Sequence, residues 1–167
     1  QALGGAKNHA MVMPDADLDN TADNVVSAAY GSAGERCMAI SVVVAVGGVG
    51  DELVSKIVER VAKLEIGDGT DPKSEMGPLI TAEAKARVES YVAGAEAEGG
   101  VVVLDGRDHK FEGNGFFTGI SLIDHVKTDS KVYLDEIFGP VLAVVRVDTF
   151  EEGLELINSH QFGNGTG

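Results

Sequence analysis

A single cysteine, Cys37, lies in surroundings that suit a reactive thiol. It follows Gly31-Ser32-Ala33-Gly34, where glycines let the backbone approach a ligand closely and present free N–H groups. The positive charge of Arg36, the preceding residue, favours the thiolate, which is the nucleophilic form. Cys37 is therefore a candidate nucleophile. The competing interpretation is a small buried hydrophobe, which is what a lone cysteine more often is.

Two other clusters carry less information by themselves. In Glu136-Ile137-Phe138-Gly139-Pro140, a carboxylate and an aromatic ring are held by a rigid Gly-Pro turn, so they could bind a ribose and stack on a ring. The competing interpretation is a solvent-facing Glu136 and a core Phe138. The stretch Leu3-Gly4-Gly5-Ala6-Lys7-Asn8 contains a Gly-Gly turn, which permits close packing but specifies little.

Composition excludes several classes of partner. The net charge of −14 would repel a nucleic-acid backbone and an anionic membrane surface. The apolar run 40–46 is too short to cross a bilayer. No G-x-G-x-x-G follows a strand pattern, and cysteine and histidine never adopt zinc-ligand spacing, so we expect no metal. The four histidines, which we expect at the surface or satisfied in the core, are His9, His109, His125 and His160.

The elements that must position these clusters alternate between helix and strand patterns. The helices expected from apolar periodicity are 15–30, 51–64, 81–98, with Thr81 as a cap, and 150–159. The expected strands are 41–46, 101–104, 117–123 and 141–147. This order predicts an α/β fold with a largely parallel sheet covered by helices. The length fits one domain, and the lone cysteine fits a reducing compartment, either a bacterial cytoplasm or a mitochondrial matrix.

Taken together, the motifs resemble the aldehyde dehydrogenase superfamily over the whole chain. The motifs that carry the resemblance are Leu3-Gly4-Gly5, Gly34-Glu35-Arg36-Cys37, Gly77-Pro78-Leu79-Ile80 and Glu136-Ile137-Phe138-Gly139-Pro140-Val141. The stretches that resemble its CoA-acylating, methylmalonate-semialdehyde branch are Ala6-Lys7-Asn8-His9, Met13-Pro14-Asp15-Ala16-Asp17, Gly31 to Ala39 and Gly163-Asn164-Gly165-Thr166.

The resemblance implies roles for four residues. Cys37 would attack a semialdehyde, and its backbone N–H would donate to the oxyanion. NAD would be the cofactor, with Glu136 holding the nicotinamide ribose and Phe138 beside the nicotinamide ring. Arg36 would bind the substrate carboxylate through two hydrogen bonds, in preference to activating the thiol. Carbon dioxide would be lost and coenzyme A would take the acyl group.

One position departs from the hydrolytic members of the family. They carry a glutamate before Leu-Gly-Gly as the base for a deacylating water, whereas this chain has Ala2. Alanine cannot accept a proton, which favours transfer to a thiol. His160-Gln161-Phe162 also departs from the family's usual Asn-Pro-Tyr, with no assigned consequence.

The resemblance further implies that residues 1–167 are a catalytic domain only. The NAD-binding and oligomerisation parts would lie outside them, the complete enzyme would be a homo-oligomer, a tetramer, and the fragment would not oxidise aldehydes alone. Three other interpretations remain open at this point. They are a hydrolytic NAD(P)-dependent aldehyde dehydrogenase, a thiol hydrolase that pairs Cys37 with a histidine, and a non-catalytic α/β interaction domain.

Overall fold

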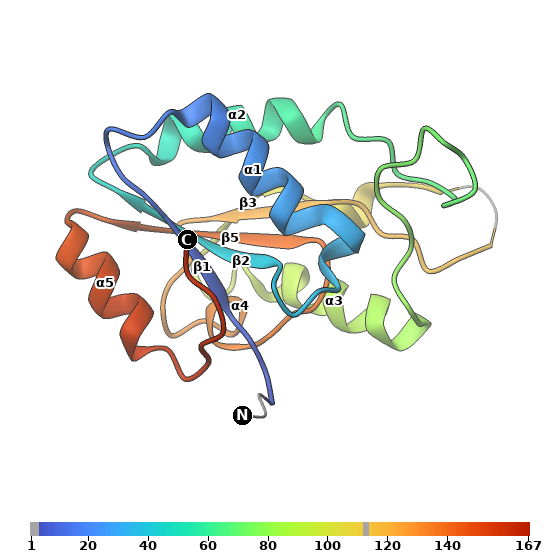
Figure 1. The fold of residues 1–167 in the computed structure, drawn as a ribbon. Helices are drawn as coiled ribbons and strands as arrows, with labels where there is room; N and C mark the ends of the chain where they lie inside the picture. The colour runs from blue at the N-terminus through green and yellow to red at the C-terminus, as the bar shows by residue number, and fades with distance from the viewer. Residues whose placement is uncertain (1–3, 112–113) are drawn as a thin grey trace.

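The structure, a computed structural model, describes residues 4–111 and 114–167. Within this part of the chain, a five-stranded sheet has the order β1-β2-β5-β4-β3 (Figure 1). The strands are β1 (Asn8–Val12), β2 (Ile40–Val46), β3 (Val101–Leu104), β4 (Ser121–Asp124) and β5 (Val141–Val147). Neighbouring strands pair in parallel, except that β3 pairs antiparallel with β4. The predicted α/β fold with a largely parallel sheet is confirmed.

Helices cover both faces of the sheet (Figure 1). On one face lie α1 (Leu18–Tyr30) and α2 (Gly50–Val61), and on the other lie α3 (Ala82–Gly94), the short α4 (Lys131–Leu134) and α5 (Phe150–Ser159). The N-cap of α1 is Asp17, whose carboxylate accepts hydrogen bonds from the N–H groups of Asp19 and Asn20. Thr81 caps α3 by accepting from the Ala84 N–H, as its position in the sequence predicts.

The central strands β2 and β5 form the middle of the core. Their fully buried residues include Val42, Val43, Val44, Leu142 and Val144. Since both faces of these strands are covered by helices, both alternating sets of side chains must be apolar. This explains why the two strands could be recognised as near-continuous apolar runs.

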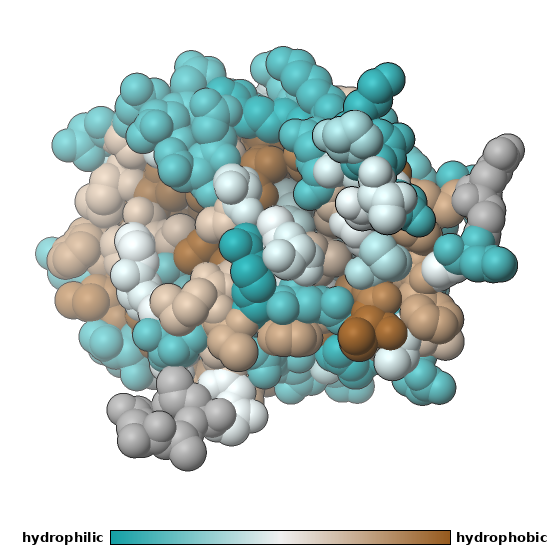
Figure 2. Space-filling model, turned by 45° about the vertical axis from the view of Figure 1, so that its right-hand side comes forward, coloured by the Kyte–Doolittle hydropathy of each residue, from teal (hydrophilic) through white to brown (hydrophobic). Residues whose placement is uncertain are grey.

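The outer surface of the α1–α2 layer is hydrophilic (Figure 2). Here Lys56 and Arg60 of α2 each form an ion pair with Asp19 of α1, both at 2.9 Å, and Arg60 also pairs with Asp23 at 2.5 Å. The carboxylates are two-thirds exposed, so water screens these pairs and each contributes little to stability. Their effect is to link the exposed sides of the two neighbouring helices.

The structure corrects several expected boundaries. The strand predicted at 117–123 is shorter and shifted, because β4 runs from Ser121 to Asp124. The third helix ends at Gly94 and the chain continues in turns to residue 99, where a helix to 98 was expected. Strand β1 and helix α4 were not predicted. Four residues are too few to show helical periodicity, and β1 begins with polar residues that are buried in the fold.

Candidate active site

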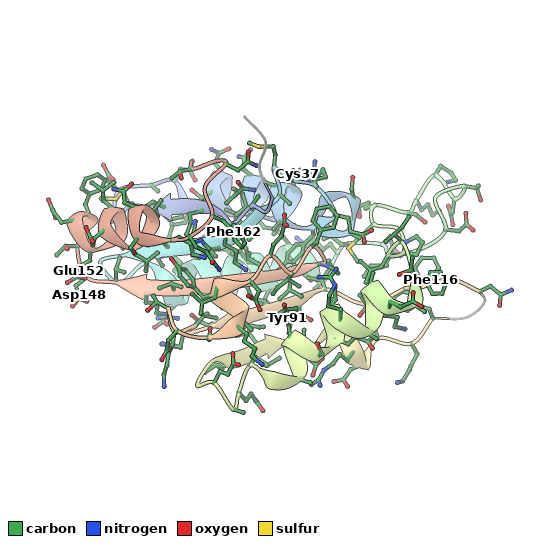
Figure 3. The ribbon with its side chains drawn as sticks, turned by 90° about the horizontal axis from the view of Figure 1, so that it is seen from below. Cys37, Tyr91, Phe116, Asp148, Glu152 and Phe162 are labelled. Carbon is green, nitrogen blue, oxygen red and sulfur yellow. The ribbon has the colours of Figure 1, made fainter. Side chains whose placement is uncertain are left out.

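Cys37 lies in a tight turn immediately before β2. The turn is closed by the Ala39 N–H, which donates to the carbonyl oxygen of Arg36 at 3.0 Å. The Cys37 side chain is exposed, at the edge of the molecule (Figure 3). The competing interpretation, in which Cys37 is a small buried hydrophobe, is therefore wrong.

The backbone before Cys37 adopts an unusual conformation. Ser32, Ala33 and Gly34 have φ angles of 53°, 54° and 70°, in the left-handed region that non-glycine residues rarely enter. A β-carbon on Gly34 would lie 2.2 Å from the carbonyl oxygen of Gly139. The loop that carries Cys37 therefore touches the loop that carries Glu136, and only glycine allows this approach.

Lys7 holds the Glu136 loop from inside the molecule. Its ammonium group is buried and donates to the carbonyl oxygens of Val132 at 2.7 Å and Asp135 at 2.6 Å. Burial lowers the pKa of Lys7 to about 8, although the nearby carboxylates of Asp135 and Glu136 raise it in part. In the sequence, Lys7 is visible only as part of a family motif, since its role as an anchor depends on contacts more than one hundred residues away in the chain.

Helix α3 holds the same loop from the other side. The Arg87 guanidinium donates to the carbonyl oxygen of Ile137, and the Tyr91 hydroxyl donates to the Asp135 carboxylate at 3.0 Å. Val88, between them on α3, packs so closely on Gly139 that a β-carbon there would lie 2.4 Å from it. These contacts fix the backbone on both sides of Glu136.

A cavity of about 320 Å³ brings the expected residues together. Its lining residues are Gly4, Gly5, Ala6, Cys37, Glu136, Phe138 and Asn164. Glu136 and Phe138 are half-buried, and Phe138 has a φ of 55°. A β-carbon on Gly4 would meet no atom within 4 Å, which shows that this wall is open. The volume is in the range of small-molecule sites.

The composition of this cavity fits part of a dinucleotide. A carboxylate can accept hydrogen bonds from ribose hydroxyls, and an aromatic ring can pack against a nicotinamide, so Glu136 and Phe138 supply the groups that such a ligand needs. Cys37 lines the same cavity, so a ring bound beside Phe138 would share it with the thiol.

Arg36 takes a different position from the one expected. Its guanidinium donates to the carbonyl oxygens of Ser27 at 3.1 Å and Ala28 at 3.4 Å, near the C-terminus of α1. A cation there complements the helix dipole. Arg36 shares a narrow gap with Cys37 and Glu136 but does not line the 320 Å³ cavity. Its role toward a substrate carboxylate stays a prediction.

The structure explains the unusual segment His160-Gln161-Phe162. The rings of His9, Tyr133, His160 and Phe162 form a cluster of mostly edge-to-face contacts between centroids about 5 to 6 Å apart. Phe162 packs against Gly5, whose β-carbon would lie 2.8 Å from the ring. His9 is buried and its Nδ1 lies 2.8 Å from the Lys7 carbonyl oxygen. This cluster therefore supports the glycine wall of the cavity.

Two asparagines of the site were not predicted from the sequence. The side-chain amides of Asn8 and Asn164 both donate to the carbonyl oxygen of Cys37, at 2.8 and 2.7 Å. No local pattern could reveal this, because the residues are separated by most of the chain.

Ala2, at the position of the hydrolytic base, and Leu3 of the first motif lie outside the described residues.

Other parts of the described chain offer no comparable chemistry. A larger depression of about 970 Å³ between α4 and α5 is lined by Glu151, Glu152 and Glu155 but by no nucleophilic thiol. No group of three metal-ligating side chains occurs within residues 4–111 and 114–167. No helix in this part of the chain is long and apolar enough to span a membrane. No histidine lines the Cys37 cavity among the described residues.

The fold and this site define an α/β domain that presents an exposed thiol to a cavity with a carboxylate and an aromatic ring. The sequence pattern of the aldehyde dehydrogenase family matches residues 1–167, and the chain belongs to that family.

Individual relatives are similar over nearly the whole chain. Identity is 55% with a malonate-semialdehyde dehydrogenase from Pseudomonas aeruginosa, over 99% of this chain and 34% of the relative. The crystal structure of a methylmalonate-semialdehyde dehydrogenase from Oceanimonas doudoroffii superposes with a TM-score of 0.96 at 52% identity, over 99% of this chain and 34% of that one. A structure from Sinorhizobium meliloti 1021, assigned to the same activity and complexed with NAD, superposes with a TM-score of 0.95 at 50% identity, over 98% of this chain and 34% of that one. The chain thus spans about a third of these relatives.

Proposed function

We propose that residues 1–167 are the catalytic domain of an NAD-dependent, CoA-acylating dehydrogenase of malonate or methylmalonate semialdehyde. The observation that carries the proposal is the shared cavity of Cys37, Glu136 and Phe138. Similarity to enzymes named for these semialdehydes supports the substrate class. A neighbour complexed with NAD supports the cofactor.

In the proposed reaction, Cys37 forms the bond to the substrate. Its thiolate attacks the aldehyde carbon to give a thiohemiacetal, and the Cys37 backbone N–H donates to the resulting oxyanion. Bound NAD supplies the acceptor for the hydride that the aldehyde carbon loses. Glu136 would hold the ribose of NAD and Phe138 would lie beside its nicotinamide. The acyl group then remains on the Cys37 sulfur as a thioester.

The fate of that thioester separates the proposal from a hydrolytic aldehyde dehydrogenase. Ala2 occupies the position at which hydrolytic members carry a glutamate, and a methyl group can neither accept a proton nor orient water. We therefore infer that the thiol of coenzyme A takes the acyl group. Arg36 would hold the substrate carboxylate before it leaves as carbon dioxide, which requires its guanidinium to leave the α1 carbonyls in the complex.

The proposal concerns a protein longer than this chain. Because the chain spans about a third of its relatives, the NAD-binding and oligomerisation parts would come from other segments. We further propose that the complete enzyme is a homotetramer. The 167 residues alone are expected not to oxidise aldehydes. Since the curated relatives are bacterial, we propose a cytoplasmic location.

Product analysis of the complete enzyme tests the proposal. Malonate semialdehyde, NAD and coenzyme A should give acetyl-CoA, NADH and carbon dioxide in equal amounts, and Cys37→Ala should abolish all three. Release of free acid at the full rate without coenzyme A would establish the hydrolytic alternative. A Cys37 that resists iodoacetamide, with no activity toward any aldehyde, would favour the non-catalytic interaction domain.

A further inference from the structure

The carbonyl oxygen of Cys37 is held by two side chains from opposite ends of the chain. Asn8 Nδ2 donates to it at 2.8 Å, and Asn164 Nδ2 donates to it at 2.7 Å. Two amide donors on one carbonyl oxygen use both of its lone pairs. The peptide group after Cys37 is therefore fixed independently of the turn hydrogen bond between Arg36 and Ala39.

Asn8 makes the buried half of this arrangement. It is 2% exposed, and its Nδ2 also donates to the Ala39 carbonyl oxygen at 2.8 Å. Both of its N–H groups are thus directed at the turn, one on each side of Met38. Its Oδ1 has no hydrogen-bond partner among the described residues, which is the cost of directing the nitrogen toward the two carbonyls.

Asn164 makes the exposed half, at the wall of the cavity. It lines the cavity together with Cys37, Glu136 and Phe138. Its φ of 103° lies in the region that favours glycine, and its sequence neighbours, Gly163 and Gly165, are glycines. A non-glycine residue there bears a conformational strain that its exposed backbone does not explain. The side-chain amide, which reaches the Cys37 carbonyl, explains it.

We propose that Asn164 is a positioning residue for the Cys37 nucleophile. The inference rests on the proposed function, in which Cys37 Sγ attacks the aldehyde. Because a peptide group is planar, fixing the Cys37 carbonyl fixes the ψ angle of Cys37 and hence the direction of its Cα–Cβ bond. The two amide donors also offset the partial negative charge of this carbonyl oxygen, which lies on the same residue as the thiolate.

Two variants of the complete enzyme separate this role from a purely conformational one. Asn164→Gly keeps the positive φ without strain but removes the amide donor. Asn164→Asp keeps the size but directs a carboxylate oxygen toward the Cys37 carbonyl. We expect kcat and the rate of Cys37 alkylation by iodoacetamide to fall about ten- to hundredfold in Asn164→Gly, and further in Asn164→Asp. The KM for NAD should change much less than kcat, since Glu136 and Phe138, which would hold the cofactor, are unchanged.

His125→Gly provides a matched control. His125 has a φ of 52° in an exposed position outside the cavity, so its replacement removes a side chain from a left-handed residue without touching the site. It should retain the wild-type kcat and alkylation rate. Alkylation is followed by mass spectrometry of the peptide that contains Cys37, and thermal unfolding is recorded for each variant.

Two results would overturn different proposals. If Asn164→Gly and Asn164→Asp are folded and keep both the wild-type kcat and the wild-type alkylation rate, the positioning role is wrong. The proposed function still holds in that case, provided that Cys37→Ala is inactive. If Cys37→Ala retains activity, the proposed function fails instead. Should one Asn164 variant fold poorly, the other decides, because the alkylation rate is referred to the folded fraction.

Discussion

The carbonyl oxygen of Gly139 approaches Gly34 so closely that a β-carbon on Gly34 would lie 2.2 Å away. This contact joins the loop that bears Cys37 to the loop that bears Glu136 and Phe138. The spacing of the thiol and the proposed cofactor groups therefore includes a backbone approach that leaves no room for a side chain.

Gly34→Ala should be among the most damaging single substitutions in the chain. The new methyl group would clash with the Gly139 carbonyl and also with a φ of 70°, which alone costs about 1–3 kcal/mol for a non-glycine residue. We expect a loss of several kcal/mol in the free energy of unfolding, measured by urea denaturation. Gly94→Ala is the control, because a β-carbon there meets nothing within 4 Å and alanine favours a helix. Equal stability of the two variants would refute the contact.

Arg36→Met separates the two roles of that side chain. The loss of hydrogen bonds to the Ser27 and Ala28 carbonyls should lower the free energy of unfolding by about 1 kcal/mol. If the guanidinium also binds the substrate carboxylate, the KM for malonate semialdehyde should rise at least about tenfold. The KM for propanal, which has no carboxylate, should not change. A variant that loses stability but keeps both KM values would show that Arg36 only caps α1.

Lys7 should make the fold more stable as the pH rises through the alkaline range. Its pKa is about 8 in the folded protein, below the ordinary lysine value of 10.5, so between these values the unfolded chain binds a proton that the folded chain does not. Over this pH range the free energy of unfolding should therefore rise by about 3 kcal/mol. The free energy of unfolding of Lys7→Met, followed from pH 8 to 10.5, should lack this gain. Lys73→Met, at an exposed position, should retain it, and identical slopes for all three proteins would rule out the buried ammonium.

His9 should act on stability in the acid range. Burial lowers its pKa to about 4, with further lowering from His160 that the hydrogen bond with the Lys7 backbone partly offsets. The folded protein therefore keeps the ring neutral while the unfolded chain protonates it below about pH 6.5. Stability should therefore fall by about 3 kcal/mol as the pH drops from 6.5 to 4. His9→Asn retains a donor near the Lys7 carbonyl but cannot titrate, so its unfolding curve should be less sensitive to pH in this window. A wild-type curve that runs parallel to that of the variant would contradict the assignment.

The sequence predicted those elements whose signals are local. Val42 to Val46 and Val141 to Val145 lie in strands that are covered on both faces, so each strand is apolar at almost every position. Thr81 caps α3 through its own side chain, which also is a local interaction. Cys37, Glu136 and Phe138 were recognised from short motifs, and the fold places them at one cavity.

The remaining features depend on contacts between distant segments. Strand β1 begins with the buried Asn8 and His9, whose partners are on the Cys37 turn and in the Tyr133–His160 cluster. Polar residues at the start of a strand look exposed in a sequence, because nothing local shows that they will be satisfied after folding. Asn8 and Asn164 meet at the Cys37 carbonyl because residues 165–167 form backbone hydrogen bonds with β1, and neither residue alone reveals this contact.

Trapping the acyl group on the complete enzyme tests the central claim most directly. Incubation with malonate semialdehyde and NAD without coenzyme A, followed by acid quenching and peptide mass spectrometry, should reveal a thioester on the peptide that contains Cys37. Addition of coenzyme A before the quench should remove it and yield acyl-CoA. An enzyme that reduces NAD with this substrate while the Cys37 peptide remains unmodified, even when coenzyme A is withheld, would contradict catalysis through a Cys37 thioester.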